Sequence, residues 1–186
     1  LCQQGKNFAN KIWNAYRLVD GWEVNSNLEI PAVNAAAIQW YKNLFQQTLS
    51  LIDDHFTKYR ISDALMSLYK LIWDNFCSWF LEMVKPSYGD PIDPGTLEAV
   101  KVIFEDNLRL LHPFMPFITE ELWHHIDKRN SYQALVVSDW PKAQISYPEV
   151  VIKLAKFASI EATAKDENQT LGSFRVGQSE FFIPLN

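Results

Sequence analysis

Apolar residues recur at helical spacing along most of the first 130 residues. Side chains at i, i+3, i+4 and i+7 share one face of an α-helix, so each apolar stripe predicts a helix with one buried side. Polar runs and prolines separate five such stripes. The predicted helices cover about residues 3–22, 33–59, 62–85, 94–112 and 118–126.

Residue types at the ends of the stripes predict where the helices begin and end. Ser62 is expected to be an N-cap, with Asp63 in the first turn, where the helix dipole favours a carboxylate. Pro86 ends the third helix because proline disfavours the helical conformation of the residue before it. Asp93 followed by Pro94 indicates an N-cap with proline at the first helical position. Five helices joined by mostly short links favour a bundle with antiparallel neighbours.

The pattern changes after Lys128, where Pro141 and Pro148 punctuate a polar stretch that cannot extend the bundle. One short amphipathic helix and alternating apolar positions typical of strands follow. The helix is expected over residues 149–157, and the strands near residues 160–162, 174–176 and 181–185.

Two parts of the chain are therefore predicted. Residues 1–130 form a helical bundle, and residues 131–186 form a small helix-plus-strands appendage. The fold class is mainly α, with an antiparallel helical bundle and an α+β appendage at its C-terminal side.

Composition narrows the classes of function. The formal net charge of −5 excludes a protein that attracts nucleic acid by a global positive field, so any RNA contact must be local. Aromatic residues make up 14% of the chain, including seven Trp, and aromatic rings beyond the needs of a core serve to stack unpaired bases. No apolar run reaches the roughly 20 residues that span a bilayer, so we expect no membrane contact. Two cysteines, Cys2 and Cys77, are too few for a disulfide framework and favour a reduced, cytoplasmic protein. The missing initial Met favours a fragment.

The sequence shows no catalytic or metal-binding pattern. The six glycines are isolated, and none of the nucleotide-binding spacings occurs. His124 and His125 are adjacent and so point about 100° apart on a helix, while His55 and His112 have no second ligand at zinc-site spacing. We expect His112 to cap the end of the fourth helix. No catalytic residue, metal site or cofactor is predicted for this chain.

One polar helix face stands out. Lys6, Asn10, Trp13 and Arg17 fall at i, i+4, i+7 and i+11 of the first helix, within about 60° of one another and opposite its apolar stripe. Arg and Asn suit base edges and phosphate, and an aromatic ring suits base stacking. The alternative is a solvated face with Trp13 packed against another helix.

Several motifs resemble a known family. GKNFANKIWNAYRLV resembles the helix that opens the anticodon-binding domain of valyl-tRNA synthetases, and LYKLIWDNFCSWFLEMVKP resembles that family's next signature. LLHPFMPFITEELWHHI is similar to a pattern shared by the valine, isoleucine and leucine enzymes, and VSDWPKA to the strand and turn after it. The resemblance implies a class I synthetase anticodon-binding bundle. It also implies a separate domain, absent from this chain, that attaches valine to tRNA with ATP and Mg.

The resemblance also implies binding residues. Asn10, Asn14 and Arg17 match the family's polar positions on the opening helix, and Trp40 matches an aromatic residue that stacks on an anticodon base. Gln39 stands where family members often carry Arg. Near residues 143–149 the chain lacks a segment that the family usually has.

These observations lead to one principal hypothesis. The chain is expected to recognise the anticodon stem-loop of valine tRNA, as a monomer, through Lys6, Asn10, Trp13, Asn14, Arg17, Gln39 and Trp40. Two alternatives stay open: the equivalent domain of an isoleucyl- or leucyl-tRNA synthetase, and a helical module whose exposed Trp residues dock a protein.

Overall fold

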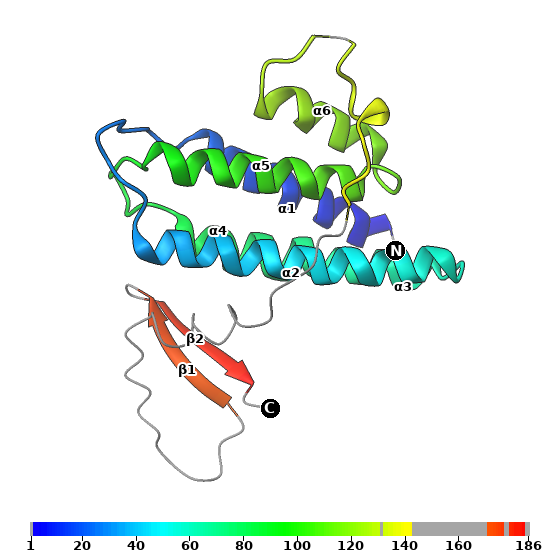
Figure 1. Cartoon of the computed structure of the whole chain (residues 1–186), viewed down its shortest axis with the longest axis horizontal. Helices are drawn as coiled ribbons and strands as arrows, with labels where there is room; N and C mark the ends of the chain where they lie inside the picture. Colours follow the sequence, from blue (N-terminus) through cyan, green and yellow to red (C-terminus); the bar gives the residue numbers. More distant parts are fainter. Residues whose placement is uncertain (1, 131, 143–170, 177–178, 185–186) are drawn as a thin grey trace. The chain divides into compact units, whose positions relative to one another are not determined.

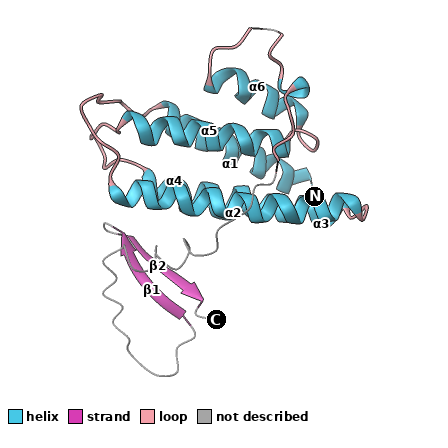
Figure 2. Ribbon diagram, viewed as in Figure 1, coloured by secondary structure: helices cyan, strands magenta, loops and turns pink. Residues whose placement is uncertain are grey.

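The computed structural model describes residues 2–130, 132–142, 171–176 and 179–184. The described helices and strands are named as in Figure 1, and Figure 2 separates the two kinds of element by colour. The helices are α1 (Cys2–Asp20), α2 (Ala32–Thr57), α3 (Ile61–Lys70), η1 (Leu71–Phe80), α4 (Leu81–Val84), α5 (Pro94–Leu111), α6 (Pro116–Ile126) and η2 (Leu135–Val137), and the strands are β1 (Leu171–Val176) and β2 (Ser179–Pro184). The mainly α fold class is thus confirmed.

The helices pack around a single apolar core. α1 lies against η1 and α6, whereas α2 lies against α3, η1, α4 and α5. In Figure 1, α6 lies on the side of α5 away from α2. Aromatic and branched side chains fill the space between helices because every helix turns one apolar stripe inward. The largest fully buried side chains are Tyr41, Phe76, Phe80, Phe104, Leu49, Ile52, Leu68, Leu71, Leu81, Leu108, Leu110 and Leu111.

The third predicted helix is continuous but changes its hydrogen-bonding pattern. α3, η1 and α4 follow one another without a break, and η1 is a π-helix of ten residues. In a π-helix each N–H bonds to the carbonyl five residues back, which is rare and usually confined to one turn. Two side chains also bond five residues back: Ser78 donates to the Trp73 carbonyl at 2.9 Å and Asn75 to the Lys70 carbonyl at 3.3 Å.

Some predicted helix ends are confirmed, and one is wrong. Asp93 is the N-cap of α5, and its Oδ1 accepts a 2.6 Å hydrogen bond from the Thr96 N–H. Ser62 is not an N-cap, because α3 begins at Ile61 and Arg60, two residues before Ser62, occupies the capping position without a side-chain hydrogen bond.

The turn between α2 and α3 is built on a tyrosine in the left-handed conformation. Tyr59 has φ 57°, its N–H donates to the Phe56 carbonyl, and the Arg60 N–H donates to the His55 carbonyl. This pair of hydrogen bonds is the Schellman motif, in which glycine is the usual residue. The Tyr59 side chain is 89% exposed.

The bundle continues past residue 130, where the sequence pattern placed the boundary. Leu135 is buried in the core, and Trp140 packs against the same core with its Nε1 3.3 Å from Asp53 Oδ1. The first compact unit of the chain is Leu1–Ser146.

The second compact unit is Tyr147–Asn186, in which the described elements form an antiparallel two-stranded sheet. β1 pairs with β2 from Leu171 opposite Pro184 to Val176 opposite Ser179. The strands predicted near residues 174–176 and 181–185 correspond to β1 and β2. The predicted helix over residues 149–157 and the strand near residues 160–162 lie outside the described residues. No helix in the described part of the chain has the length and apolar character that crossing a membrane requires.

Candidate nucleic-acid interface

The polar face of α1 points into solvent. Burial of Phe8, Ile12, Ala15 and Val19 fixes which side of α1 meets the core. The opposite side therefore exposes four of the predicted site residues. Among the described residues, none of these four side chains has a hydrogen bond or ion pair with another part of the protein. They are Lys6, Asn10, Asn14 and Arg17.

Trp13, the predicted stacking ring of this face, is partly used inside the protein. It is half-buried and meets the His125 ring of α6 edge to face, with centroids 5.7 Å apart and an interplanar angle of 89°. The Tyr16 ring lies 5.9 Å from Trp13 and 5.6 Å from His125. Trp13 therefore helps to join α1 to α6, which is the packing role that the sequence left open as an alternative.

Gln39 and Trp40 lie on a different helix, near the start of α2. Gln39 is exposed and donates to Asn43 Oδ1 at 3.3 Å. Trp40 is half-buried against the core, with its ring 6.1 Å from that of Tyr41. The two groups of predicted residues are thus carried by α1 and α2, which both pack on η1.

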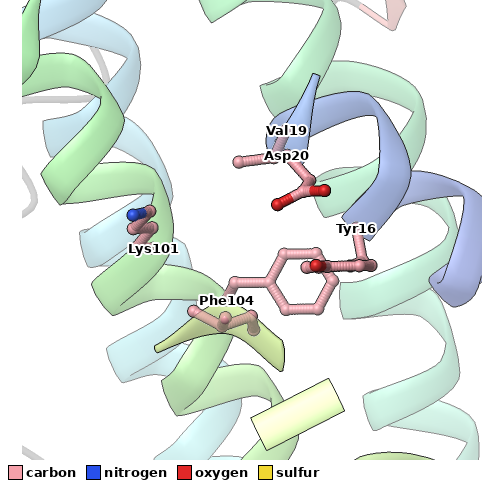
Figure 3. Close-up of a pocket in the computed structure, with 6 residues that line it drawn as sticks. Tyr16, Val19, Asp20, Lys101 and Phe104 are labelled. Carbon is pink, nitrogen blue, oxygen red and sulfur yellow. The ribbon is translucent and has the colours of Figure 1, made fainter. Parts of the chain in front are cut away.

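A cleft between α1, α5 and α6 opens beside this polar face (Figure 3). The cleft is small: its water-accessible volume is about 40 Å³, and the empty space of about 300 Å³ around it includes open solvent. Desolvation raises the pKa of the Tyr16 hydroxyl, and its hydrogen bond and charge interaction with Asp20 raise the pKa further. The six lining residues are Tyr16, Val19, Asp20, Lys101, Phe104 and Ile126.

Sequence reasoning did not select Asp20 or Lys101 as site residues. One signal was present at Asp20: a carboxylate at the last residue of a helix opposes the helix dipole, which favours cations there. Lys101 gave no signal, because it is one of many surface lysines on a helix whose contacts are set by tertiary packing.

Three histidines at the end of α5 and on α6 bond to side chains of α6. His112 is the C-cap residue of α5, as the sequence predicted, and its backbone N–H donates to the Leu108 carbonyl. Its ring does not make the cap: Nδ1 lies 2.8 Å from Thr119 Oγ1 and so joins α5 to α6. His124 and His125 each face a glutamate one turn earlier, at 3.1 and 3.2 Å. In the described part of the chain, no group of three or more His, Cys, Asp or Glu side chains is placed to hold a metal ion.

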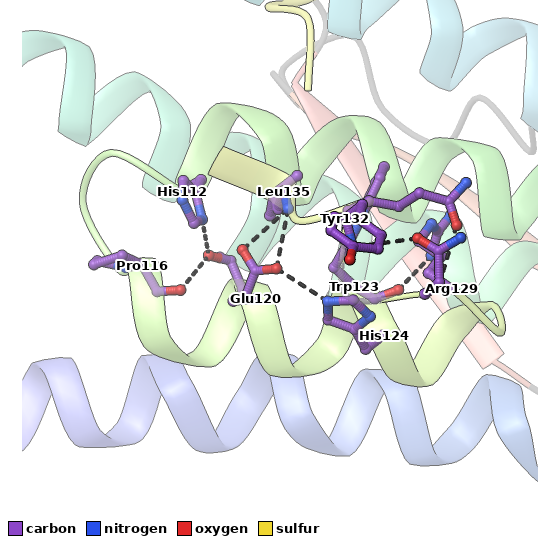
Figure 4. A network of polar contacts seen from close by, with 11 residues as sticks. His112, Pro116, Glu120, Trp123, His124, Arg129, Tyr132 and Leu135 are labelled. Atoms are coloured by element: carbon purple, nitrogen blue, oxygen red, sulfur yellow. Dashed lines mark hydrogen bonds and ion pairs between the residues drawn. The ribbon is translucent and has the colours of Figure 1, made fainter. Parts of the chain in front are cut away.

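The segment after α6 is held by an extensive polar network (Figure 4). Both carboxylate oxygens of Glu120 accept from the Leu135 N–H at 3.0 Å. The Trp123 indole donates to the Gln133 carbonyl at 2.8 Å. Two guanidinium groups lie over its ring, with Arg109 4.7 Å and Arg129 3.8 Å from the ring centroid. The network is structural: it fixes the chain that leads from α6 to η2.

The helical bundle and its exposed polar face are consistent with what comparison with known proteins shows. Residues 39–178 match the family described as the anticodon-binding domain of tRNA ligase. The chain therefore belongs to the anticodon-binding domains of tRNA ligases. Three relatives of the chain are named valine–tRNA ligases. Their names confirm the resemblance that the motifs indicated.

Three relatives illustrate the similarity. The valine–tRNA ligase of Christiangramia forsetii is 51% identical over 173 residues, covering 90% of this chain and 20% of that protein. That of Parabacteroides distasonis is 52% identical over 145 residues, covering 78% of this chain and 17% of the relative. That of Phocaeicola vulgatus is 40% identical over 230 residues, covering the whole chain and 26% of the relative. The chain thus spans about a fifth of the length of these proteins.

The alignment with the Phocaeicola vulgatus protein is longer than the chain itself. It extends over 230 residues, although the chain has 186. This relative therefore has residues inside the aligned region that the chain lacks. That the missing residues belong near residues 143–149 of this chain stays a prediction.

Proposed function

We propose that this chain recognises the anticodon arm of valine tRNA as part of a valine–tRNA ligase. The observation that supports the proposal best is the exposed face of α1, where Asn10, Asn14 and Arg17 have no partner among the described residues. A row of unpaired amides with a guanidinium has the donors and acceptors that unpaired RNA bases and phosphates require.

Each residue has a role that its surroundings allow. Arg17 and Lys6 are free to pair with phosphates, and Asn10 and Asn14 with base edges or ribose hydroxyls. Trp40 supplies a half-buried ring for stacking, held in place by its contact with the core. Gln39 bonds to Asn43 and is a weaker candidate for a phosphate contact than the Arg that the resemblance implies at this position. The contacts are local, as a chain with net charge −5 demands.

The proposal extends to the whole protein. Its relatives are named valine–tRNA ligases, so the whole protein is proposed to attach valine to tRNA with ATP and Mg²⁺ bound in a domain outside this chain. We further propose that it acts as a monomer in the cytoplasm.

The experiment measures binding of the chain to labelled valine tRNA, to the same tRNA with its anticodon bases exchanged, and to isoleucine tRNA, each at two salt concentrations. A preference for the native valine anticodon supports the proposal. Equal binding to all three RNAs, with a steep salt dependence, would reduce the interaction to a phosphate contact and contradict recognition of the anticodon.

The alternative of a protein-docking module has less support than RNA recognition. It required exposed tryptophans, and none of the seven tryptophans is exposed: Trp123 is buried and the other six are half-buried. Their rings are used in packing within the bundle.

A further inference from the structure

The turn between α2 and α3 lies beyond the start of α1, at the right of the view in Figure 1. α2 and α3 pack against each other up to this turn. Apolar side chains stay exposed on α3 there: Ile61 is 51%, Leu65 37% and Met66 65% exposed. We propose that the segment directly preceding residue 1 in the whole protein packs on these three side chains, which form the α3 apolar patch.

Contacts of α1 show that it runs in the same direction as the continuous helix that begins with α3. The Phe8 ring lies 4.9 Å from the Tyr69 ring and 6.2 Å from the Trp73 ring. Further along α1, the Lys11 ammonium lies 5.3 Å from the centroid of the Trp73 ring and 3.3 Å from Ser78 Oγ. An advance along α1 is thus matched by an advance from Tyr69 toward Ser78.

This shared direction places the α3 apolar patch where α1 is only beginning. Parallel helices advance together by about 1.5 Å per residue. Leu65, one turn before Tyr69, therefore lies level with Gln4 in the first turn of α1. Ile61, two turns before Tyr69, lies level with a position two turns before Phe8, which falls ahead of residue 1. The described part of α1 ends before it can cover the patch.

The patch continues a helix face that α1 already covers further along. Ile61, Leu65 and Tyr69 are spaced four residues apart and so share one face of the helix. Tyr69 is half-buried under α1, whereas the two residues before it on this face are exposed. The charged residues of α3, Asp63 and Lys70, lie on the opposite side, about 150° from Leu65. The patch is therefore an extension of the apolar α1 interface and offers no cation to a phosphate.

The size of the patch selects the preceding segment over a second copy of the chain. Three apolar side chains offer far less than the roughly 800 Å² per partner that a standard interface buries. A segment joined to α1 needs no such area, because the covalent link holds it at a high effective concentration. The chain spans about a fifth of the length of its relatives, so most of the proposed whole protein lies outside it. The inference rests on that part of the proposed function and not on its RNA contacts.

Oxidation of Met66 measures whether the patch is covered. Hydrogen peroxide converts an exposed methionine to its sulfoxide, and mass spectrometry follows each methionine separately. Met66 should react several-fold more slowly in the whole protein than in this chain. A free methionine-containing peptide in both samples calibrates the oxidant. Equal rates in the two proteins would overturn the inference.

Photo-crosslinking identifies what covers the patch. Benzoylphenylalanine in place of Met66 in the whole protein should cross-link to the residues directly before residue 1. The same group in place of Lys70, an exposed residue on the charged side of α3, is the control and should not reach them. Cross-links from position 66 to another part of the protein, or to a second copy detected as a doubled mass, would contradict the proposed occupant.

Both measurements are made without RNA. Their failure would therefore leave anticodon recognition unaffected, and a chain that does not distinguish anticodons would still give the expected oxidation rate and cross-link.

Discussion

The Tyr41 hydroxyl donates a 2.9 Å hydrogen bond to Asn107 Oδ1, joining α2 to α5 in the fully buried centre of the bundle. The amide nitrogen of Asn107 is buried without a partner, so this hydrogen bond is the main compensation for burying the side chain. Burial also raises the pKa of Tyr41 well above its usual range, which keeps the hydroxyl protonated as a donor.

Tyr41→Phe should lower the free energy of unfolding by about 1–3 kcal/mol, because it leaves the Asn107 oxygen buried and unpaired. Urea unfolding measures the change. Tyr88→Phe, at a fully exposed position, is the control and should have no effect. Equal stability of the two variants would mean that water satisfies Asn107.

Tyr59→Gly should raise the free energy of unfolding by about 1 kcal/mol, because glycine adopts the left-handed conformation without the clash that a Cβ atom causes. The midpoint of urea unfolding measures the gain. Tyr88→Gly is the matched control: its tyrosine is also exposed but has negative φ, so glycine there should be neutral or destabilising. Destabilisation by Tyr59→Gly would indicate that the exposed ring makes a stabilising contact.

Arg17→Gln should weaken binding to valine tRNA. It should also reduce the steepness of the plot of log affinity against log salt by about 1, the amount expected for the loss of one phosphate contact. The slope is obtained by titration at several salt concentrations. Arg60→Gln, another exposed arginine but in the turn between α2 and α3, is the control and should keep the slope of the unmodified chain. Identical slopes for both variants would remove Arg17 from the interface.

Trp40→Leu should weaken RNA binding by about 1–3 kcal/mol through the loss of base stacking. Leucine keeps apolar contact with the core, so most of the stability should remain. Trp73→Leu, at another half-buried tryptophan, controls for loss of aromatic packing. If Trp40→Leu lowers stability as Trp73→Leu does but leaves RNA affinity unchanged, Trp40 is a packing residue only.

Burial raises the pKa of the Cys77 thiol from 9.0 to about 12. The folded state thus holds its proton more tightly than the unfolded state, and stability falls as pH rises through the unfolded pKa. Between about pH 7.5 and about pH 9.5 this group should cost roughly 0.8 kcal/mol. Urea unfolding of the unmodified chain and of Cys77→Ala at both pH values isolates the effect, because the variant lacks it. Parallel pH dependence in the two proteins would show that Cys77 does not contribute.

The sequence predicted the five helical segments because apolar spacing reports directly which side of a helix is buried. It could not predict η1, since the same stripe from Leu68 to Met83 is compatible with bonding four or five residues back. The Ser62 prediction failed because a capping preference of about 1 kcal/mol is outweighed by the Schellman turn, which places the N-cap of α3 at Arg60, two residues earlier.

The sequence predicted only the part of the candidate site that lies on a single helix, α1. The residues of α1 could be grouped by angle alone, and four of them are exposed as expected. Spacing along one helix could not predict that His125 of α6 packs on Trp13, nor that Lys101 of α5 and Asp20 of α1 line one cleft. These relationships depend on how helices distant in sequence are placed.

The ten-residue π-helix affects where the bundle can tolerate the deletion of a residue. Removing one residue from a buried α-helix turns every later side chain by about 100° and separates the apolar stripe into two faces. Within η1, a deletion can instead be absorbed by a return from five-residue to four-residue bonding, so that the residues on either side keep their orientation toward the core. Leu71–Phe80 is therefore the part of the buried helix where natural variants shorter by one residue are most readily accommodated.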